Sequence, residues 1–145
     1  MDQNCSELIA TLESSPRITA SLVASAPTEQ GVYVLWLQSE PQVCLKVGIA
    51  GPRSGKGLRE RLSYHFSGND SISVLSRHLA ADSQSTWVSG YELTNQQERK
   101  RFLSERCFFQ ALALPGLTRG ELLGIEEELI LNLAPRYAGR VKRAR

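Results

Sequence analysis

The chain has 145 residues and a net charge of +2, with 41% hydrophobic and 22% charged residues. This length and composition indicate one globular domain with its own hydrophobic core. The longest purely apolar run, residues 32–37, is too short to span a membrane, and the N-terminus lacks the basic start and apolar stretch of a secretion signal. We therefore expect a cytoplasmic protein with no membrane partner.

Its cysteines should be reduced, with the last two in the core, because their spacing suits neither a disulfide framework nor a zinc site (Cys5, Cys44 and Cys107).

The first half of the chain is predicted to contain two helical segments and a β-hairpin. Residues 4–14 have helical character up to Pro16, which cannot continue a helix. Residues 17–26 are expected to form a further helical turn. Aromatic and β-branched residues predict a strand over 32–37, and a short loop connects it to a returning strand over 43–49.

In the second half, helices predominate. We expect helices over residues 57–66, 72–80, 95–105 and 118–133. Residues 107–114 should supply the third strand, and residues 87–93 are a further strand candidate. The predicted fold is therefore α+β, a small three-stranded, mainly antiparallel sheet flanked by helices.

A glycine-rich basic loop separates the hairpin from the next helix, where a phosphate-binding loop would lie. Its spacing departs from the nucleotide-binding motif, because only three residues separate Gly51 from Gly55 and Gly57 stands where a hydroxyl is needed. A nucleotide-hydrolysing site is therefore disfavoured. Contact with nucleic-acid phosphates through Arg53 and Lys56 remains open.

The last predicted helix has a carboxylate in the middle of its apolar face. A helical wheel places Glu126 near the centre of the apolar face, between Leu133 and Ile130, whereas Glu127 and Glu128 point toward water. A carboxylate in such a place is costly unless it is paired or binds a metal ion. The alternatives are a salt bridge to an arginine and a partly exposed helix edge.

The helix over residues 57–66 has a cation and an imidazole side by side. Arg61 and His65 are four residues apart, so they share one edge of the buried face, and Arg59 points elsewhere. The alternative is that the pair lies on the protein surface and has no functional role.

The hairpin adds a phenol and an ammonium. If Leu37 pairs with Gln42, Tyr33 stands opposite Lys46 on the same face of the sheet. A neighbouring ammonium favours the ionised phenol, which would make Tyr33 a stronger base. The alternative is an ordinary amphipathic cross-strand pair.

Together these residues resemble the GIY-YIG nuclease superfamily over residues 28–140. The first motif is present as Gly-Val-Tyr at 31–33. The second motif, normally Tyr-Ile-Gly, is Lys-Val-Gly at 46–48. The catalytic Arg of the family corresponds to Arg61, the His that often follows corresponds to His65, and the metal-binding Glu corresponds to Glu126. The chain departs from the family at Lys46 and at Ala138, which replaces a commonly found Asn.

The resemblance implies a metal-dependent endonuclease that hydrolyses DNA phosphodiester bonds, and RNA stays open as an alternative substrate. Glu126 would hold one Mg²⁺ or Mn²⁺ ion, and Tyr33 would deprotonate the attacking water with help from Lys46. Arg61 would bind the phosphate, and His65 would orient Tyr33 or the phosphate. The alternative is an inactive nucleic-acid-binding module that keeps the fold but not the reaction.

We expect three parts: an N-terminal helical segment over residues 1–27 that packs on the domain, a nuclease domain over 28–140, and a basic tail over 141–145. The last ten residues contain five of the seventeen basic residues and none of the fifteen acidic ones, so the rest of the chain has a net charge of −3. The tail suits phosphate binding, although it could also be a solubilising terminus. No DNA-reading motif is recognisable, so a protein partner could supply target specificity. The residues expected to contact nucleic acid are Arg53, Lys56, Arg59, Arg140 and Lys142.

Overall fold

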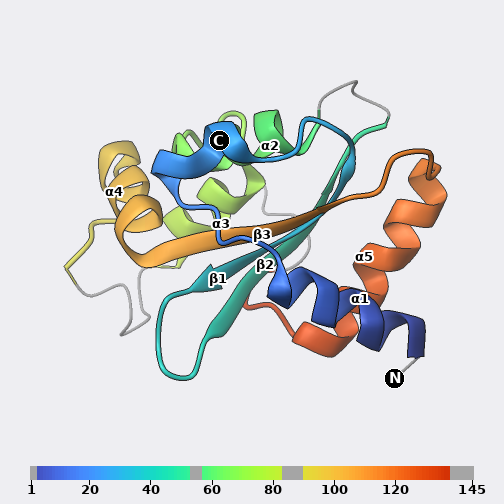
Figure 1. Ribbon diagram of the computed structural model, residues 1–145. Helices are drawn as coiled ribbons and strands as arrows, with labels where there is room; N and C mark the ends of the chain where they lie inside the picture. Colours follow the sequence, from blue (N-terminus) through green and yellow to red (C-terminus); the bar gives the residue numbers. More distant parts are fainter. Residues whose placement is uncertain (1–2, 53–56, 83–89, 138–145) are drawn as a thin grey trace.

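The computed structural model describes residues 3–52, 57–82 and 90–137, and their architecture is α+β, as predicted. Three antiparallel strands form a sheet in the order β2-β1-β3, so β1 is central and β2 lies at an edge. Helices α1 and α5 cover one face, and the remaining helices cover the other (Figure 1). The elements are α1 (Gln3–Ser14), the 3₁₀ helix η1 (Ala20–Ser25), β1 (Gly31–Leu37), β2 (Val43–Ala50), α2 (Leu58–Phe66), α3 (Val74–Ala81), α4 (Gln96–Arg106), β3 (Cys107–Ala113) and α5 (Arg119–Leu133).

The central strand is buried along its whole length because helices cover both of its faces. Its side chains alternate between two cores. Tyr33 and Leu35 face the core beneath α2, α3 and α4, and Val32 and Val34 face the core beneath α1 and α5. The three cysteines are buried and free, so the expected core positions of Cys44 and Cys107 are confirmed (Cys5, Cys44 and Cys107).

The predicted register of the hairpin is wrong by two residues. Leu37 pairs with Val43, because the loop is one residue longer than assumed, and a bulge at Leu45 adds one more residue to β2. Tyr33 therefore stands opposite Gly48, and Lys46 stands opposite Leu35. Because two single-residue shifts preserve the alternation of the side chains, Tyr33 and Lys46 still share a face.

The candidate strand over residues 87–93 is not a strand where the structure describes it. Residues 90–93 form a turn that leads into α4, and residues 87–89 lie outside the described ranges. Tyr91 packs its ring against Phe102 of α4, and Leu93 is buried in the same core. The apolar residues of this segment therefore pack against a helix and not in the sheet.

The segment before β1 packs directly on the sheet. Ile18 and Phe109 of β3 exchange two backbone hydrogen bonds of 2.7 and 2.9 Å. The Gln110 amide donates to the carbonyl oxygens of Glu13 and Ser15 at the end of α1.

In the described part of the chain, no helix has the length and apolar character needed to cross a membrane.

Candidate functional site

An open pocket of about 470 Å³ lies beside the edge strand β2. At an edge strand, side chains from helices on opposite faces of the sheet can meet, and here α2 and α5 both contribute to the lining. The structure thus brings together all five residues that the resemblance implicates in catalysis, namely Tyr33, Lys46, Arg61, His65 and Glu126.

The glycine of the second motif makes room for the tyrosine of the first. Gly48 is the cross-strand partner of Tyr33, and a Cβ at this position would overlap the ring and hydroxyl of Tyr33. Any larger residue at Gly48 would therefore displace the phenol. Lys46 lies two residues earlier on β2 and lines the same pocket.

Tyr33 and His65 form a buried pair at the bottom of the site. The Tyr33 hydroxyl lies 2.7 Å from Nε2 of His65, and both side chains are only 3% exposed. Burial, together with Lys46 and Arg61, lowers the pKa of His65 to about 3, so its imidazole is neutral at physiological pH.

The pKa of Tyr33 moves in the opposite direction to the one expected from the sequence. Burial raises it above the usual value for a phenol; Arg61 opposes this shift, and Glu126 adds to it. The expectation that Lys46 makes Tyr33 a stronger base is therefore wrong, because loss of water around the phenol outweighs the nearby positive charge.

Three cations line the pocket, and each lacks an ion-pair partner in the part of the chain that the structure describes. Among the described residues, Lys46, Arg61 and Arg119 form no ion pair and no hydrogen bond through their side chains, and the buried Nε atom of Arg61 has no acceptor. Burial lowers the pKa of Lys46, with Glu126 opposing and Arg61 adding to the shift. Unpaired cations in a pocket are suited to an anionic ligand.

Glu126 is half-buried on the face of α5 that packs on the sheet, and its neighbours Glu127 and Glu128 are exposed, as the helical wheel predicts. No ion pair to Glu126 is formed within the described residues, so the alternative of a salt bridge finds no support. Burial raises the pKa of this carboxyl, which Lys46 and Arg119 oppose.

Glu126 is the only carboxylate that lines the pocket among the described residues, and it could contribute one ligand to a divalent metal ion. Within residues 3–52, 57–82 and 90–137, there is no group of three or more potential metal ligands from His, Cys, Asp and Glu. Mg²⁺ is commonly held by one or two carboxylates, with water and substrate phosphate oxygens as its other ligands. Glu126 supplies one carboxylate in an open pocket, which suits this mode.

The residues expected to contact nucleic acid are mostly not placed. Arg59 lies outside the pocket, and its Nε donates to the carbonyl oxygen of Ala26 at 3.0 Å. Arg53, Lys56, Arg140 and Lys142 lie outside the described residues, as do Ala138 and the tail over 141–145.

Arg119 is a pocket residue that the sequence analysis missed. It lies in the first turn of α5, seven residues before Glu126, so the two share one face of the helix. The helical wheel that singled out Glu126 could therefore also have predicted that Arg119 lies on the same side of the helix.

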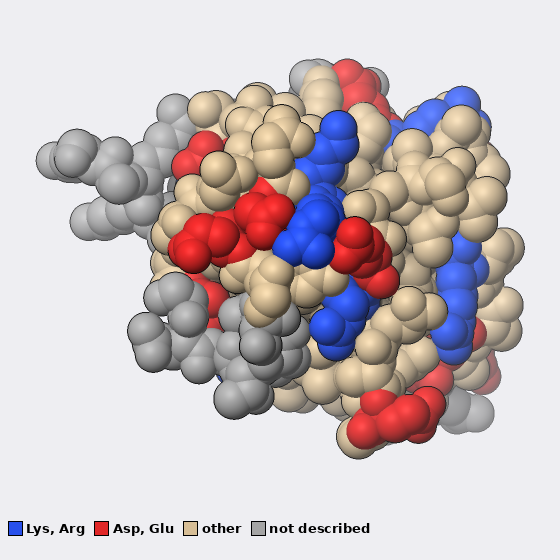
Figure 2. All heavy atoms as spheres, turned by 90° about the vertical axis from the view of Figure 1, so that its left-hand side faces the viewer, with Lys and Arg blue, Asp and Glu red and all other residues tan. Residues whose placement is uncertain are grey.

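The charge pattern of the pocket differs from that of the face around α4. On that face, basic and acidic side chains are interspersed (Figure 2), and Arg101 forms ion pairs with Glu98 and Glu105 at 2.9 and 3.3 Å. The arrangement of charges around Glu126 therefore differs from that on the face around α4.

Comparison with known proteins gives no relative: no family model, no curated protein and no solved structure matches the chain. The resemblance to GIY-YIG nucleases therefore rests on the identity, order and placement of the site residues.

Proposed function

We propose that the protein is a metal-dependent endonuclease that hydrolyses DNA phosphodiester bonds through a GIY-YIG-type site in which Lys46 replaces the second-motif tyrosine. One observation carries this proposal. Three cations that form no ion pair within the described ranges converge with a half-buried carboxylate and a buried tyrosine–histidine pair. Phosphodiester hydrolysis needs such a set, because it combines phosphate binding, charge stabilisation and proton transfer.

Arg61 and Lys46 account for the binding of the scissile phosphate. The guanidinium of Arg61 can donate two parallel hydrogen bonds to phosphate oxygens, and its unpaired Nε is available for one of them. Lys46 adds a compact positive charge at the same pocket. Both groups would also stabilise the extra negative charge that develops in the transition state.

Tyr33 and His65 account for activation of the attacking water. The phenol is protonated at neutral pH, because its pKa is raised. It can therefore accept a proton from water only while it passes its own proton to Nε2 of the neutral His65, 2.7 Å away. Glu126 would hold the Mg²⁺ or Mn²⁺ ion, which when bound polarises the scissile phosphate and stabilises the leaving oxygen.

The proposal is tested by incubating the purified protein with supercoiled plasmid in Mg²⁺ or in EDTA. We expect nicked plasmid only with Mg²⁺, and no nicking by Glu126→Gln, which removes a charge but little volume. Glu127→Gln is the matched control, because this carboxylate is the exposed neighbour on the same helix. Nicking by Glu126→Gln at the wild-type rate would exclude the metal-binding role.

The second candidate function is a nucleic-acid-binding module without catalysis. The observation that favours it is the raised pKa of Tyr33, since the same three cations would bind a phosphate backbone even if no water were activated. Retardation of DNA in a gel without Mg²⁺-dependent nicking would support this function. Parallel assays with RNA and with cell extract fractions test the other substrate and a partner that supplies target specificity.

A further inference from the structure

His65 has a second hydrogen-bond partner that the reaction proposed above does not use. Its Nδ1 atom lies 2.7 Å from Oγ of Ser73, which is only 1% exposed. Ser73 is also the N-cap of α3, where its Oγ accepts the backbone N–H of Ser76 at 3.2 Å. The hydroxyl thus joins the imidazole to the start of a helix.

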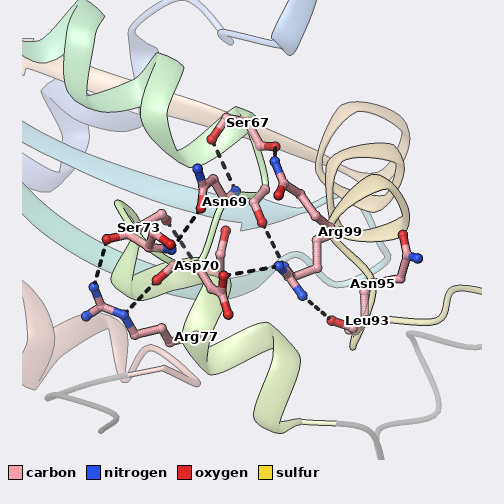
Figure 3. A network of polar contacts seen from close by, with 12 residues as sticks. Ser67, Asn69, Asp70, Ser73, Arg77, Leu93, Asn95 and Arg99 are labelled. Atoms are coloured by element: carbon pink, nitrogen blue, oxygen red, sulfur yellow. Dashed lines mark hydrogen bonds and ion pairs between the residues drawn. The ribbon is translucent and has the colours of Figure 1, made fainter. Parts of the chain in front are cut away.

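The loop that carries Ser73 is held rigidly by α4 (Figure 3). The guanidinium of Arg99, in a side chain that is 4% exposed, donates to the carbonyl oxygens of Gly68 and Leu93 at 2.8 and 3.0 Å, and lies 3.8 Å from Asp70. Gly68 has a φ of +72°, and a Cβ there would lie 2.8 Å from the carbonyl oxygen of Gln96. The loop therefore packs too closely on α4 to shift without breaking these contacts.

We propose that Ser73 is a positioning residue, which fixes the N–H of His65 on Nδ1 and thereby aims an unprotonated Nε2 at Tyr33. A neutral imidazole has one N–H, so a hydrogen bond donated from Nδ1 to Ser73 leaves Nε2 free to accept. A partner on the second ring nitrogen is the usual device for setting the tautomer of a functional histidine.

The proton path then balances, although it rests on the proposed function. Water gives a proton to the Tyr33 oxygen, and the phenolic proton passes to Nε2. The resulting hydroxide attacks phosphorus, the bond from phosphorus to the leaving sugar oxygen breaks, and this oxygen takes up a proton from solvent. The imidazolium keeps its Nδ1–H on Ser73 and later returns a proton through Tyr33 to solvent. The charged and titratable groups that face His65 are Tyr33 from β1, Lys46 from β2 and Arg61 from its own helix.

The test combines nitrogen-15 NMR of the histidine ring with single-turnover plasmid cleavage in Mg²⁺. The chain has only two histidines, so His65→Gln assigns the signals. In the wild type, we expect the N–H on Nδ1. Ser73→Gly should give a mixture of tautomers and an approximately tenfold slower cleavage step with unchanged DNA affinity.

Two further variants separate positioning from helix stability. Glycine is tolerated at an N-cap, so Ser73→Gly costs α3 little, and Ser73→Thr keeps the hydroxyl and should stay close to the wild type. Asn95→Gly is the matched control, because Asn95 caps α4 but does not touch His65. It should leave the tautomer and the rate unchanged.

The two readouts keep this proposal and the proposed function distinguishable. A wild-type N–H on Nε2, or a tautomer unchanged in Ser73→Gly, overturns the positioning role whether or not the protein cleaves DNA. Loss of the single tautomer in Ser73→Gly supports that role even if the wild type fails to nick plasmid, and in that case only the proposed function is lost.

Discussion

Two clusters in the described part of the chain are built from the same four residue types and differ in how their charges are used. Each has a tyrosine, a histidine, an arginine and a carboxylate. The pocket beside β2 has Tyr33, His65, Arg61 and Glu126, and the cluster at the end of α3 has Tyr137, His78, Arg136 and Asp82.

In the second cluster, the charges satisfy one another. Arg136 donates to both carboxylate oxygens of Asp82 at 2.8 and 3.2 Å, and the Tyr137 hydroxyl donates to the same group at 2.6 Å. The backbone N–H groups of residues 136 and 137 bind two carbonyl oxygens of β2. This cluster thus fastens the segment after α5 to the sheet and to α3.

In the pocket, by contrast, Arg61 and Glu126 form no such pair, although both line the same space. Charges left apart in a folded protein lower its stability unless a ligand satisfies them. The two clusters have the same residue types, so the difference lies in how the side chains are arranged. Paired charges stabilise the fold, whereas charges held apart can bind an external anion.

The same substitution in both clusters should have different consequences for the protein. Tyr33→Phe and Tyr137→Phe each delete a buried hydroxyl, so each should lower the free energy of unfolding by about 1–2 kcal/mol. Only Tyr33→Phe should slow cleavage, by about a hundredfold or more, because it removes the group that takes the proton from water. Single-turnover cleavage and urea titrations measure the two effects, and an equal loss of rate in both variants would refute the distinction.

The arginines of the two clusters should also differ: Arg61 should affect the cleavage rate, and Arg136 should affect the stability of the fold. Arg61→Ala should slow cleavage by about a hundredfold, because a charge-stabilising donor is lost from the transition state. Arg136→Ala should lower the midpoint of urea unfolding with the rate little changed. Arg59→Ala controls for general basicity, since Arg59 lies on the same helix but outside the pocket. Equal rate losses for Arg59→Ala and Arg61→Ala would indicate a diffuse basic surface.

Lys46→Met should slow cleavage about tenfold near pH 7, because it deletes one charge next to the phosphate. Since burial lowers the pKa of Lys46, the wild type loses this charge below the pH range of an ordinary lysine. The ratio of the two rates should therefore shrink as the pH rises, through a decline of the wild-type rate. A rise of the Lys46→Met rate with a constant wild-type rate would instead mean that Lys46 acts on the supply of base.

The neutral state of His65 predicts how stability depends on pH. Its pKa is about 3 in the folded protein and about 6.5 when exposed. Between these values the unfolded chain binds a proton that the folded protein does not, so stability is complete above pH 6.5 and falls as the pH decreases toward 3. Urea titrations should show a progressive loss of stability as the pH decreases through this window, and His65→Gln should remove that component.

Much of this site was predictable because its residues break the pattern of their elements. Glu126 interrupts an apolar face of α5, and the polar His65 lies within the buried face of α2, with Arg61 half-buried one turn earlier. The register of the hairpin was not predictable, because neither the bulge at Leu45 nor the length of the loop leaves a signal in the hydrophobic pattern.

Other features depend on packing that no local pattern encodes. From the sequence, Ser73 is expected only to begin a helix. The contact of Ser73 with His65 depends on the loop between them, which Arg99 of α4 holds through the carbonyl oxygen of Gly68. The expected base strength of Tyr33 failed for a similar reason. Its pKa is set by the layers that bury it, whereas the sequence revealed only a neighbouring charge.

The smallest expected effect concerns Arg119, which distinguishes a binding contact from a catalytic one. Arg119 lies in the first turn of α5 and is exposed at the pocket, with no ion-pair partner among the described residues. A phosphate contact of this kind contributes to affinity in a salt-dependent manner and equally for all DNA sequences. Arg119→Ala should therefore weaken DNA binding a few-fold and reduce the slope of log affinity against log salt concentration by about one. The cleavage rate at saturating protein and Mg²⁺ should stay close to that of the wild type, because the proposed proton path runs through Tyr33 and His65 and does not include Arg119. An unchanged salt slope, measured by fluorescence anisotropy with a short duplex, would remove Arg119 from the phosphate-binding surface and leave it as a neighbour of Glu126 that lowers the pKa of this carboxyl.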